Sequence, residues 1–344
     1  MKTAVVICPG RGTYTKTELG CLGAHFPDAD LLARFDARRA ERGEETLSAL
    51  DGAARYSVAR HTRGDNASAL IYAATLGDFL SIDREAIDIV AVTGNSMGWY
   101  SALALAGALD HEAGFDLVNT MGAFMQEAMI GGQLVIPIVG EDWRPDPAQR
   151  SEVLALMAEI AAREDHELSL SIDLGGMLVL AGNETALEAF EGRYLAQDRY
   201  PLRLANHAGF HAAMQAPVAE RGRASLGAAL FGQPDLPLID GRGAVWWPGA
   251  TSPVNLWDYT LGHQVTEPYD FAGAVRTAAR EFAPDLFIVT GPGTTLGGAV
   301  AQSLIAADWR GMGDKDAFRT RQARDPVLAS MGMADQRAWV TKRA

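Results

Sequence analysis

Short apolar runs alternate along the chain with longer segments of helical periodicity. Three of the runs, at residues 4–8, 87–93 and 286–290, are continuous and rich in β-branched residues, which predicts buried strands. Because helical segments separate these runs, we expect the strands to lie parallel in one sheet that helices cover on both faces. The pattern therefore predicts an α/β fold with a parallel-sheet large domain.

The segment from about residue 132 to 206 follows a different order of elements. Strand, helix, strand, strand, helix and strand patterns lie, in turn, at residues 134–139, 148–163, 167–172, 177–181, 185–195 and 201–205. The order βαββαβ predicts a ferredoxin-like subdomain. We place it at residues 131–206, inserted into a discontinuous large domain of residues 1–130 and 207–309, and expect a small-molecule site in the cleft between the lobes.

The second buried run ends in a tight turn centred on Ser96. Gly94 and Gly98 flank this serine in a G-x-S-x-G string, and an Ala/Leu-rich helical pattern follows at residues 99–109. A strand, a strained turn and a helix in this order form a nucleophile elbow, as in a hydrolase-like α/β domain. The helix N-terminus would stabilise the oxyanion that forms when Ser96 attacks a carbonyl carbon.

Composition narrows the function classes. The 344 residues carry a net charge of −13 and 48% of them are hydrophobic, which predicts a large core and argues against nucleic-acid binding. No run approaches the roughly 18 apolar residues of a membrane span, and the N-terminal run reads as a strand rather than a signal peptide. We therefore expect a cytoplasmic protein that binds no membrane. Cys8 and Cys21 are too few for a disulfide framework or a cysteine metal site.

Charge is unevenly distributed along the chain. Residues 310–344 contain eight Lys or Arg and four Asp, so this basic C-terminal extension carries about +4 and the remainder about −17. Two interpretations follow. The extension either binds an acidic partner or packs loosely on the surface in solvent.

Six short motifs follow one another within residues 3–303. They are Pro-Gly-Arg-Gly at 9–12, Gly-Asn-Ser-Met-Gly-Trp-Tyr-Ser-Ala at 94–102, the segment 117–128, Phe210-His211 followed by Pro217, Gln-Val-Thr-Glu-Pro at 264–268, and Gly-Pro-Gly at 291–293. In this order they resemble the malonyl-CoA:acyl carrier protein transacylases and the acyltransferase domains of polyketide synthases. That family also carries its small subdomain where the ferredoxin-like pattern falls.

The resemblance implies an acyl transfer in two steps, in fatty acid or polyketide biosynthesis. Ser96 would attack an acyl-CoA, and the phosphopantetheine thiol of an acyl carrier protein would then cleave the acyl-serine. The acyl group would be malonyl or another short unbranched group. No cofactor is expected besides the acyl-CoA substrate and the phosphopantetheine of the partner. An acyl-thioester hydrolase on the same scaffold is the alternative.

The catalytic assignments follow from the same resemblance. His211 occupies the position of the family's catalytic histidine, and an imidazole can take the Ser96 proton and return it to the leaving thiol. A main-chain carbonyl near Gln264 would orient His211. The main-chain N–H groups of Arg11 and Met97 would form the oxyanion hole.

Four positions bear on substrate binding. Met121 replaces an arginine that holds the carboxylate in malonyl-specific members, so a neutral acyl group is expected unless another cation substitutes. Arg11, where glutamine is usual, is that candidate cation, and a side chain in solvent is the alternative. Phe210 matches a bulky residue associated with unbranched acyl groups, and Asn95 replaces the usual histidine before the nucleophile.

Three further residues complete the expectations. Trp99 and Thr290 each stand where the family has glutamate, and Trp99 together with Phe210 is expected to shield an acyl-enzyme from water. His207 forms an H-x-x-x-H string with His211. Because neither a helix nor an adjacent glutamate supports a metal site there, we expect no metal.

Overall fold

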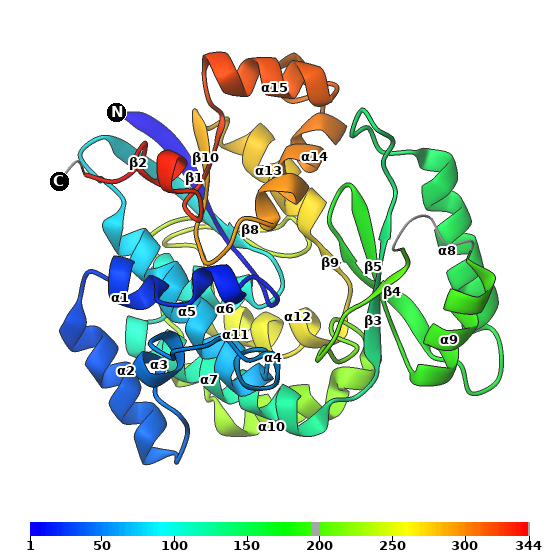
Figure 1. The fold of residues 1–344 in the computed structure, drawn as a ribbon, viewed down its shortest axis with the longest axis horizontal. Helices are drawn as coiled ribbons and strands as arrows, with labels where there is room; N and C mark the ends of the chain where they lie inside the picture. Colours follow the sequence, from blue (N-terminus) through cyan, green and yellow to red (C-terminus); the bar gives the residue numbers. More distant parts are fainter. Residues whose placement is uncertain (195–199, 343–344) are drawn as a thin grey trace.

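The computed structural model describes residues 1–194 and 200–342 (Figure 1). Its larger sheet holds six strands in the order β11–β10–β1–β2–β7–β8. The strands are β1 (Lys2–Cys8), β2 (Ile87–Gly94), β7 (Leu238–Ile239), β8 (Val245–Trp246), β10 (Leu286–Val289) and β11 (Leu328–Ser330). All neighbours are parallel except β7 and β8. Residues 4–8 of the central strand β1 are fully buried, which explains their continuous apolar run.

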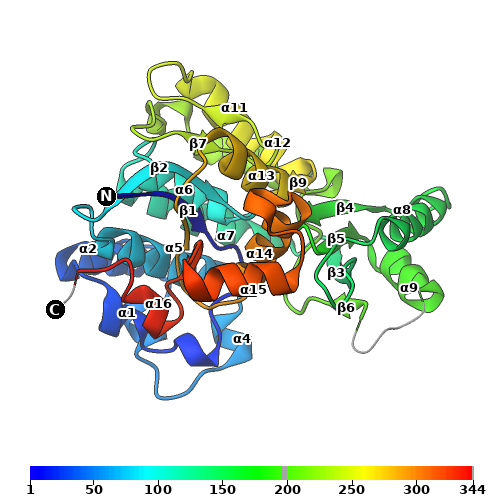
Figure 2. The same ribbon diagram turned by 90° about the horizontal axis from the view of Figure 1, so that it is seen from above.

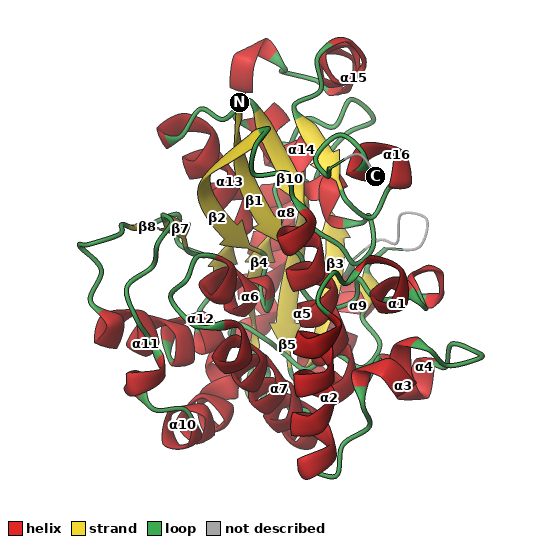
Figure 3. Ribbon diagram, turned by 90° about the vertical axis from the view of Figure 1, so that its left-hand side faces the viewer, coloured by secondary structure: helices red, strands yellow, loops and turns green. Residues whose placement is uncertain are grey.

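Helices surround the strands of the larger sheet (Figure 3). Helices α5 (Gly64–Ser81), α6 (Gly98–Leu105) and α7 (His111–Ala128) pack on one another, with α6 against β1 and β2, while α13 (Phe271–Glu281) packs with α14 (Leu296–Ala306). The others are α1 (Cys21–His25), α2 (Ala29–Glu41), α3 (Leu47–Asp51), α4 (Val58–His61), α10 (Ala216–Ser225), α11 (Pro253–Leu261), α12 (His263–Thr266), α15 (Lys315–Arg324) and α16 (Ala334–Arg337). Within the described residues, none of the helices has the length and apolar character needed to cross a membrane.

A second sheet lies at one end of the molecule (Figure 2) and has five strands in the order β6–β3–β5–β4–β9. Its elements and their two helices are β3 (Gly132–Pro137), α8 (Pro147–Ala161), β4 (Leu168–Asp173), β5 (Met177–Gly182), α9 (Glu184–Arg193), β6 (Leu202–Arg203) and β9 (Tyr269–Asp270). The first four strands of the sheet pair antiparallel, as in ferredoxin-like folds. Leu195, the expected end of α9, lies outside the described residues. The predicted α/β fold with a ferredoxin-like subdomain is confirmed.

Two features connect the smaller lobe to the large domain, a strand from outside the predicted subdomain and the alternating side chains of β3. Strand β9, which comes after residue 206, pairs in parallel with β4 and so completes the smaller sheet with a segment from beyond the predicted subdomain. Along β3, Leu134 and Ile136 belong to the core of the smaller lobe, whereas Val135 belongs to the larger core. This alternation follows from the period of a strand, and it lets the smaller lobe form one wall of the site.

The C-terminal segment is part of the large domain. Residues 328–330 form β11 beside β10, and Val340 is 1% exposed. The side chain of Arg337 pairs with the buried carboxylate of Asp78. The interpretation that the segment from residue 310 packs loosely on the surface is therefore wrong, because its apolar run at 327–331 supplies an edge strand and Arg337 supplies a charge partner in the interior. The interpretation that it binds an acidic partner stays a prediction.

Candidate active site

Ser96 lies at the turn between β2 and α6 and has left-handed backbone angles, with φ 57°. Glycine is needed at position 98, because a Cβ there would lie 2.2 Å from the main-chain oxygen of Cys8 in β1. The close approach of strand and helix thus holds a non-glycine residue in a conformation that costs about 1–3 kcal/mol. Because α6 begins at Gly98, its N-terminus faces the serine, as an elbow requires.

The elbow brings Ser96 together with His211 and Gln264. Ser96 Oγ lies 2.7 Å from Nε2 of His211, and Nδ1 of His211 lies 2.7 Å from the main-chain oxygen of Gln264. A carbonyl oxygen only accepts, so Nδ1 carries the ring proton and Nε2 is free to accept the proton of the serine hydroxyl. The side-chain Nε2 of Gln264 also donates to the main-chain oxygen of Ser96 at 3.1 Å, a contact that sequence reasoning missed.

Burial sets the charge of His211. The residue is 4% exposed, and desolvation lowers the pKa of its imidazole to about 4, against the opposing effect of the hydrogen bond to Gln264. The ring is therefore neutral at pH 7, which is the form that accepts a proton. His211 also has left-handed backbone angles, with φ 54°. Both members of the pair thus hold strained conformations that the surrounding structure maintains.

A chain of hydrogen bonds from the smaller sheet supports the loop that carries His211. Ser171 in β4 donates to the main-chain oxygen of Phe210 at 2.7 Å and accepts from Nε2 of Gln133 in β3 at 2.8 Å. The Oε1 atom of Gln133 lies 3.1 Å from Nδ1 of His207. Sequence reasoning missed Gln133 and Ser171. The available signal was a polar residue within each of two apolar strands, because buried polar groups have partners.

The hydrogen bond of Ser96 Oγ is made with His211 and not with His207. Burial, with a smaller contribution from the Arg11 guanidinium, lowers the pKa of His207 to about 3, so this ring is also neutral at pH 7. Among residues 1–194 and 200–342, no three His, Cys, Asp or Glu side chains gather into a group that could hold a metal ion.

The loop after β1 lies against the elbow. A Cβ at Gly10 would come 2.6 Å from the main-chain oxygen of Asn95, so glycine is required for this approach. The main-chain N–H groups of Arg11 and Met97 donate no hydrogen bond to any part of the chain that the structure describes. Two free N–H groups beside a serine nucleophile are the donors that an oxyanion needs.

Two cavities meet at Ser96. The first has a mostly apolar wall formed by Tyr100, Val118, Met121, Met125 and Val265. The second lies between the lobes and is bordered by Val135, Ile172 and Val179 of the smaller sheet. Arg11, Ser96 and Phe210 border both cavities. The serine is therefore accessible from two compartments.

The four predicted substrate-binding positions all border at least one cavity. Met121 is 1% exposed and lies in the wall of the first cavity. Asn95 borders the second, where its Oδ1 is buried without a hydrogen-bond partner among the described residues. The guanidinium of Arg11 lies 5.4 Å from the ring centre of Phe210, and its Nε and Nη1 atoms are buried. Its side chain is thus directed into the protein rather than into solvent.

Trp99 and Thr290 border neither cavity. The indole of Trp99 is fully buried, donates to Oγ1 of Thr260 at 3.0 Å and packs edge-on against Tyr259. Thr290 donates to the main-chain oxygen of Ile7 at 3.3 Å. The expectation that Trp99 shields an acyl-enzyme from water is wrong, because α6 directs this side chain toward α11.

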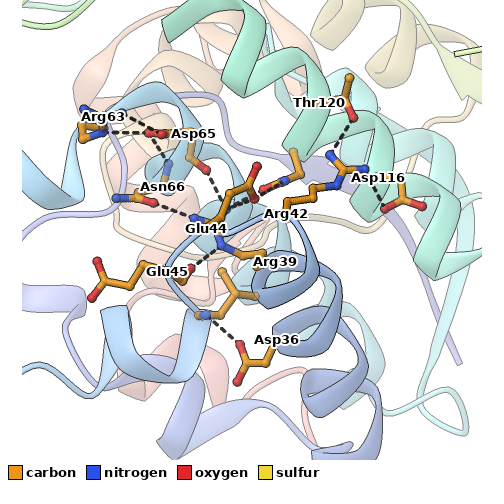
Figure 4. A network of polar contacts seen from close by, with 12 residues as sticks. Asp36, Arg39, Arg42, Glu44, Glu45, Arg63, Asp65, Asn66, Asp116 and Thr120 are labelled. Atoms are coloured by element: carbon orange, nitrogen blue, oxygen red, sulfur yellow. Dashed lines mark hydrogen bonds and ion pairs between the residues drawn. The ribbon is translucent and has the colours of Figure 1, made fainter. Parts of the chain in front are cut away.

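Helices α5 and α7, which contribute to the first cavity, are tied together by Arg39 of α2 (Figure 4). Its side chain is fully buried, and its guanidinium donates to Oδ1 of Asn66 at 2.6 Å and to Oδ1 of Asn119 at 2.5 Å. Its Nε donates to the main-chain oxygen of Glu45. Sequence reasoning missed Arg39, although its spacing of four residues from the buried Phe35 places it on the inner face of α2.

No protein-family model matches the chain. The malonyl CoA-acyl carrier protein transacylase of Escherichia coli (strain K12) is 29% identical over 151 residues, which cover 43% of this chain and 46% of that protein. The solved malonyl-CoA:ACP transacylase of Synechocystis sp. PCC 6803 superposes with a TM-score of 0.73 at 18% identity, over 99% of this chain and 100% of that one. A type II polyketide synthase acyl carrier protein in complex with its malonyl-transacylase matches with a TM-score of 0.71 at 20% identity, over 98% of each chain. The chain is a relative of the malonyl-CoA:acyl carrier protein transacylases.

Two findings that cover different shares of the chain support the similarity to these transacylases. The solved structures, at 18% and 20% identity, establish a shared fold over nearly the whole chain. The sequence match to the Escherichia coli transacylase spans about half of that protein's length, 46%. The substrate of the present chain is therefore argued from its own site.

Proposed function

We propose that the chain moves an acyl group from coenzyme A to the phosphopantetheine thiol of an acyl carrier protein through an acyl-Ser96 intermediate. The observation that carries the proposal is the 2.7 Å contact between Ser96 Oγ and Nε2 of His211, whose Nδ1 is held by the carbonyl of Gln264. A serine at an elbow, paired with a neutral imidazole, is activated for attack on a carbonyl carbon. The names of the Escherichia coli relative and of the carrier protein complex support the choice of donor and acceptor.

In the first half-reaction, His211 acts as a general base. Its Nε2 takes the hydroxyl proton while Oγ of Ser96 bonds to the thioester carbon. The main-chain N–H groups of Met97 and Arg11 would donate to the oxyanion that develops. When the tetrahedral intermediate collapses, the C–S bond breaks and the departing sulfur takes the proton from His211. Free coenzyme A leaves, and the acyl group stays on Ser96 as an ester.

The second half-reaction repeats these steps with a different nucleophile. His211 Nε2 takes the proton of the phosphopantetheine thiol, and the sulfur attacks the acyl-serine ester. Collapse of the intermediate breaks the C–O bond and returns the proton to Ser96 Oγ. The cycle is a ping-pong reaction that uses no cofactor besides the coenzyme A thioester and the phosphopantetheine arm of the partner.

A time course with and without carrier protein tests the proposal. The wild-type protein is incubated with malonyl-CoA alone, with malonyl-CoA and holo-carrier, or with malonyl-CoA and an apo-carrier that lacks phosphopantetheine. We expect rapid acylation of the holo-carrier only and slow release of free malonate in all three samples. Ser96→Ala is the matched control and should form no acyl-carrier.

The hydrolase alternative predicts that the same acyl-enzyme transfers its acyl group to water rather than to the carrier thiol. Water would then attack acyl-Ser96 with the help of His211, and free acid would appear as fast without carrier as with it. Of the two aromatic residues that were expected to exclude water, Phe210 alone borders the cavities within the described part of the chain. Free acid release that holo-carrier does not suppress would therefore replace the transferase proposal by the hydrolase.

A further inference from the structure

Arg11 carries two unsatisfied guanidinium nitrogens beside the nucleophile. Its Nη2 donates to the main-chain oxygens of Thr62 and Asn206 at 3.1 Å and 3.0 Å. Its Nε and Nη1 atoms are buried and have no hydrogen-bond partner among the described residues. Buried donors without acceptors are rare in native proteins, and a buried charge without a partner is costlier still. The two nitrogens therefore indicate an acceptor that comes from outside the chain.

The charge of Arg11 is not neutralised by the described residues. Asp65 is the acidic group that acts on it, but the carboxylate of Asp65 pairs with the guanidinium of Arg63 at 2.9 Å. Burial outweighs the influence of Asp65 and lowers the pKa of Arg11 to about 10, so that the side chain remains charged at pH 7. The neighbouring His207 is neutral, because burial lowers its pKa to about 3.

The position of Arg11 limits what the missing acceptor can be. Arg11 borders the same two cavities as Ser96. A Cβ at Gly64 would come 3.2 Å from Nη1, and a Cβ at Gly122, in the wall of the first cavity, would come 2.7 Å from the main-chain oxygen of Gly64. Nη1 therefore lies on the side of the first cavity, which Ser96 also borders. A ligand that contacts both Arg11 and Ser96 fits within this shared cavity and has an anionic end.

We propose that Arg11 binds the free carboxylate of a short dicarboxylic acyl group whose thioester end reacts with Ser96. The inference rests on the proposed acyl transfer and narrows its donor to the coenzyme A thioester of a short dicarboxylic acid, such as malonyl-CoA. An ionised carboxylate accepts charge-assisted hydrogen bonds from the guanidinium without any transfer of a proton. A neutral acyl group such as acetyl leaves the same nitrogens unpaired.

Arg11 has no substitute in the cavity walls. Of the described residues that border either cavity, it is the single Lys or Arg. Met121, at the position where the sequence resemblance implies an arginine, contributes a thioether to the first cavity and so supplies no charge. The preference for a carboxylate should therefore depend on one side chain.

The selectivity of Ser96 acylation tests this inference. Initial rates of labelling by malonyl-CoA and by acetyl-CoA are measured by intact-mass spectrometry for wild type, Arg11→Gln and Arg11→Lys. We expect wild type to prefer malonyl-CoA at least 10-fold and Arg11→Gln to lower the malonyl-to-acetyl ratio by about 10-fold or more, the scale of a lost charge-assisted hydrogen bond. Arg11→Lys should fall between them because it keeps the charge without the planar fork.

A matched control comes from Arg34 of α2. Its side chain is 51% exposed and pairs with Glu112 at 2.8 Å, outside both cavities. Arg34→Gln makes the same chemical change as Arg11→Gln and should leave the malonyl-to-acetyl ratio at its wild-type value. Thermal melting of each variant shows whether it is folded. If Arg11→Gln does not fold, Arg11→Lys carries the test, with an expected fall in the ratio of about 3-fold or more.

Affinity measured on a variant that cannot react separates substrate recognition from catalysis. Ser96→Ala cannot be acylated, so calorimetry on this variant measures the affinity for malonyl-CoA and acetyl-CoA directly. Adding Arg11→Gln to Ser96→Ala should weaken malonyl-CoA by about 10-fold or more, and acetyl-CoA by much less.

Different experimental results would overturn the inference and the proposed function. Wild type that prefers acetyl-CoA, or Arg11→Gln that slows both substrates equally, would overturn the carboxylate site and leave acyl-Ser96 intact. Absence of labelling by every acyl-CoA, or labelling that persists in Ser96→Ala, would overturn the acyl transfer itself.

Discussion

Two arginines of this chain have buried guanidinium nitrogens and differ in how completely their hydrogen bonds are satisfied. Arg39, at the junction of α2, α5 and α7, has a partner for every guanidinium nitrogen, including the side chain of Asn66 (Figure 4) and that of Asn119. Arg11, beside Ser96, has partners for Nη2 and none for Nε and Nη1 within the described residues. The chain itself supplies acceptors for all the guanidinium nitrogens of Arg39, whereas two nitrogens of Arg11 need an acceptor from a ligand.

The same difference extends to the surroundings of the two arginines. At the Arg39 junction the chain provides the acceptors, and Glu44 adds a carboxylate at 3.4 Å. Around Arg11 the chain provides a strained serine, a strained histidine, two free main-chain N–H groups and two cavities. Unpaired groups and strain gather where chemistry is expected, because a folded protein maintains them only at a cost in stability.

The largest expected effect is on folding stability, and it should separate the two arginines. Arg39→Gln leaves several buried acceptors without a donor and should lower the free energy of unfolding by about 3 kcal/mol or more. Arg11→Gln removes a charge that was already unpaired and should change it by less than about 1 kcal/mol. Urea unfolding of both variants measures the two values. Equal losses would show that Arg11 is as structural as Arg39.

A second substitution tests whether the strained pair serves chemistry. His211→Ala removes the proposed general base and should slow acylation by malonyl-CoA roughly 100-fold or more. His166→Ala, which changes a half-buried histidine of the smaller lobe that borders neither cavity, is the control and should acylate at the wild-type rate. Rapid-quench mass spectrometry gives both rates. An unchanged rate in His211→Ala would move the role of base elsewhere, with His207 as the next candidate.

The acid stability of the site should also depend on the unpaired charge of Arg11. The pKa of His207 is lowered to about 3 in the folded chain, whereas an unfolded histidine titrates near 6.5. Between these values the unfolded state binds the extra proton, so this residue lowers stability as the pH falls below about 6.5. His211, with a pKa of about 4, acts in the same direction.

Urea unfolding at pH 7.5 and pH 5 measures this effect. His207→Gln should reduce the loss of stability between the two pH values by on the order of 1–2 kcal/mol. Arg11→Gln should reduce it by a smaller amount, because the guanidinium is the lesser cause of the low pKa of His207. The same acid sensitivity in wild type and His207→Gln would contradict a neutral, buried His207.

Periodicity predicted the parts of the fold that rest on long, regular patterns. The runs that became β1, β2 and β10 and the βαββαβ order of the smaller lobe follow from apolar residues repeated over several turns or strands. Strands of two or three residues carry too little pattern to be found. For this reason sequence reasoning missed β9, which completes the smaller sheet, and β11, which makes residues 328–330 part of the larger one.

For the site, too, residues placed by local sequence were predictable and residues placed by tertiary contacts were not. The turn around Ser96 is local, so its glycines and the following helix predicted it. His211 and Gln264 were placed by resemblance to a family, since no local pattern links residues so far apart in the chain. The roles of Gln133 and Ser171 depend on which main-chain oxygen faces them, and the direction of Trp99 depends on the packing of α6 against α11. These are properties of the tertiary structure.

The central claim is that one serine carries the acyl group, and peptide mapping of the acyl adduct tests it most directly. The protein is incubated with malonyl-CoA, digested and analysed by tandem mass spectrometry. The proposal predicts one modified peptide, with the malonyl group on Ser96, and no adduct in Ser96→Ala. An adduct on any other residue, or an adduct that survives the substitution, would contradict it.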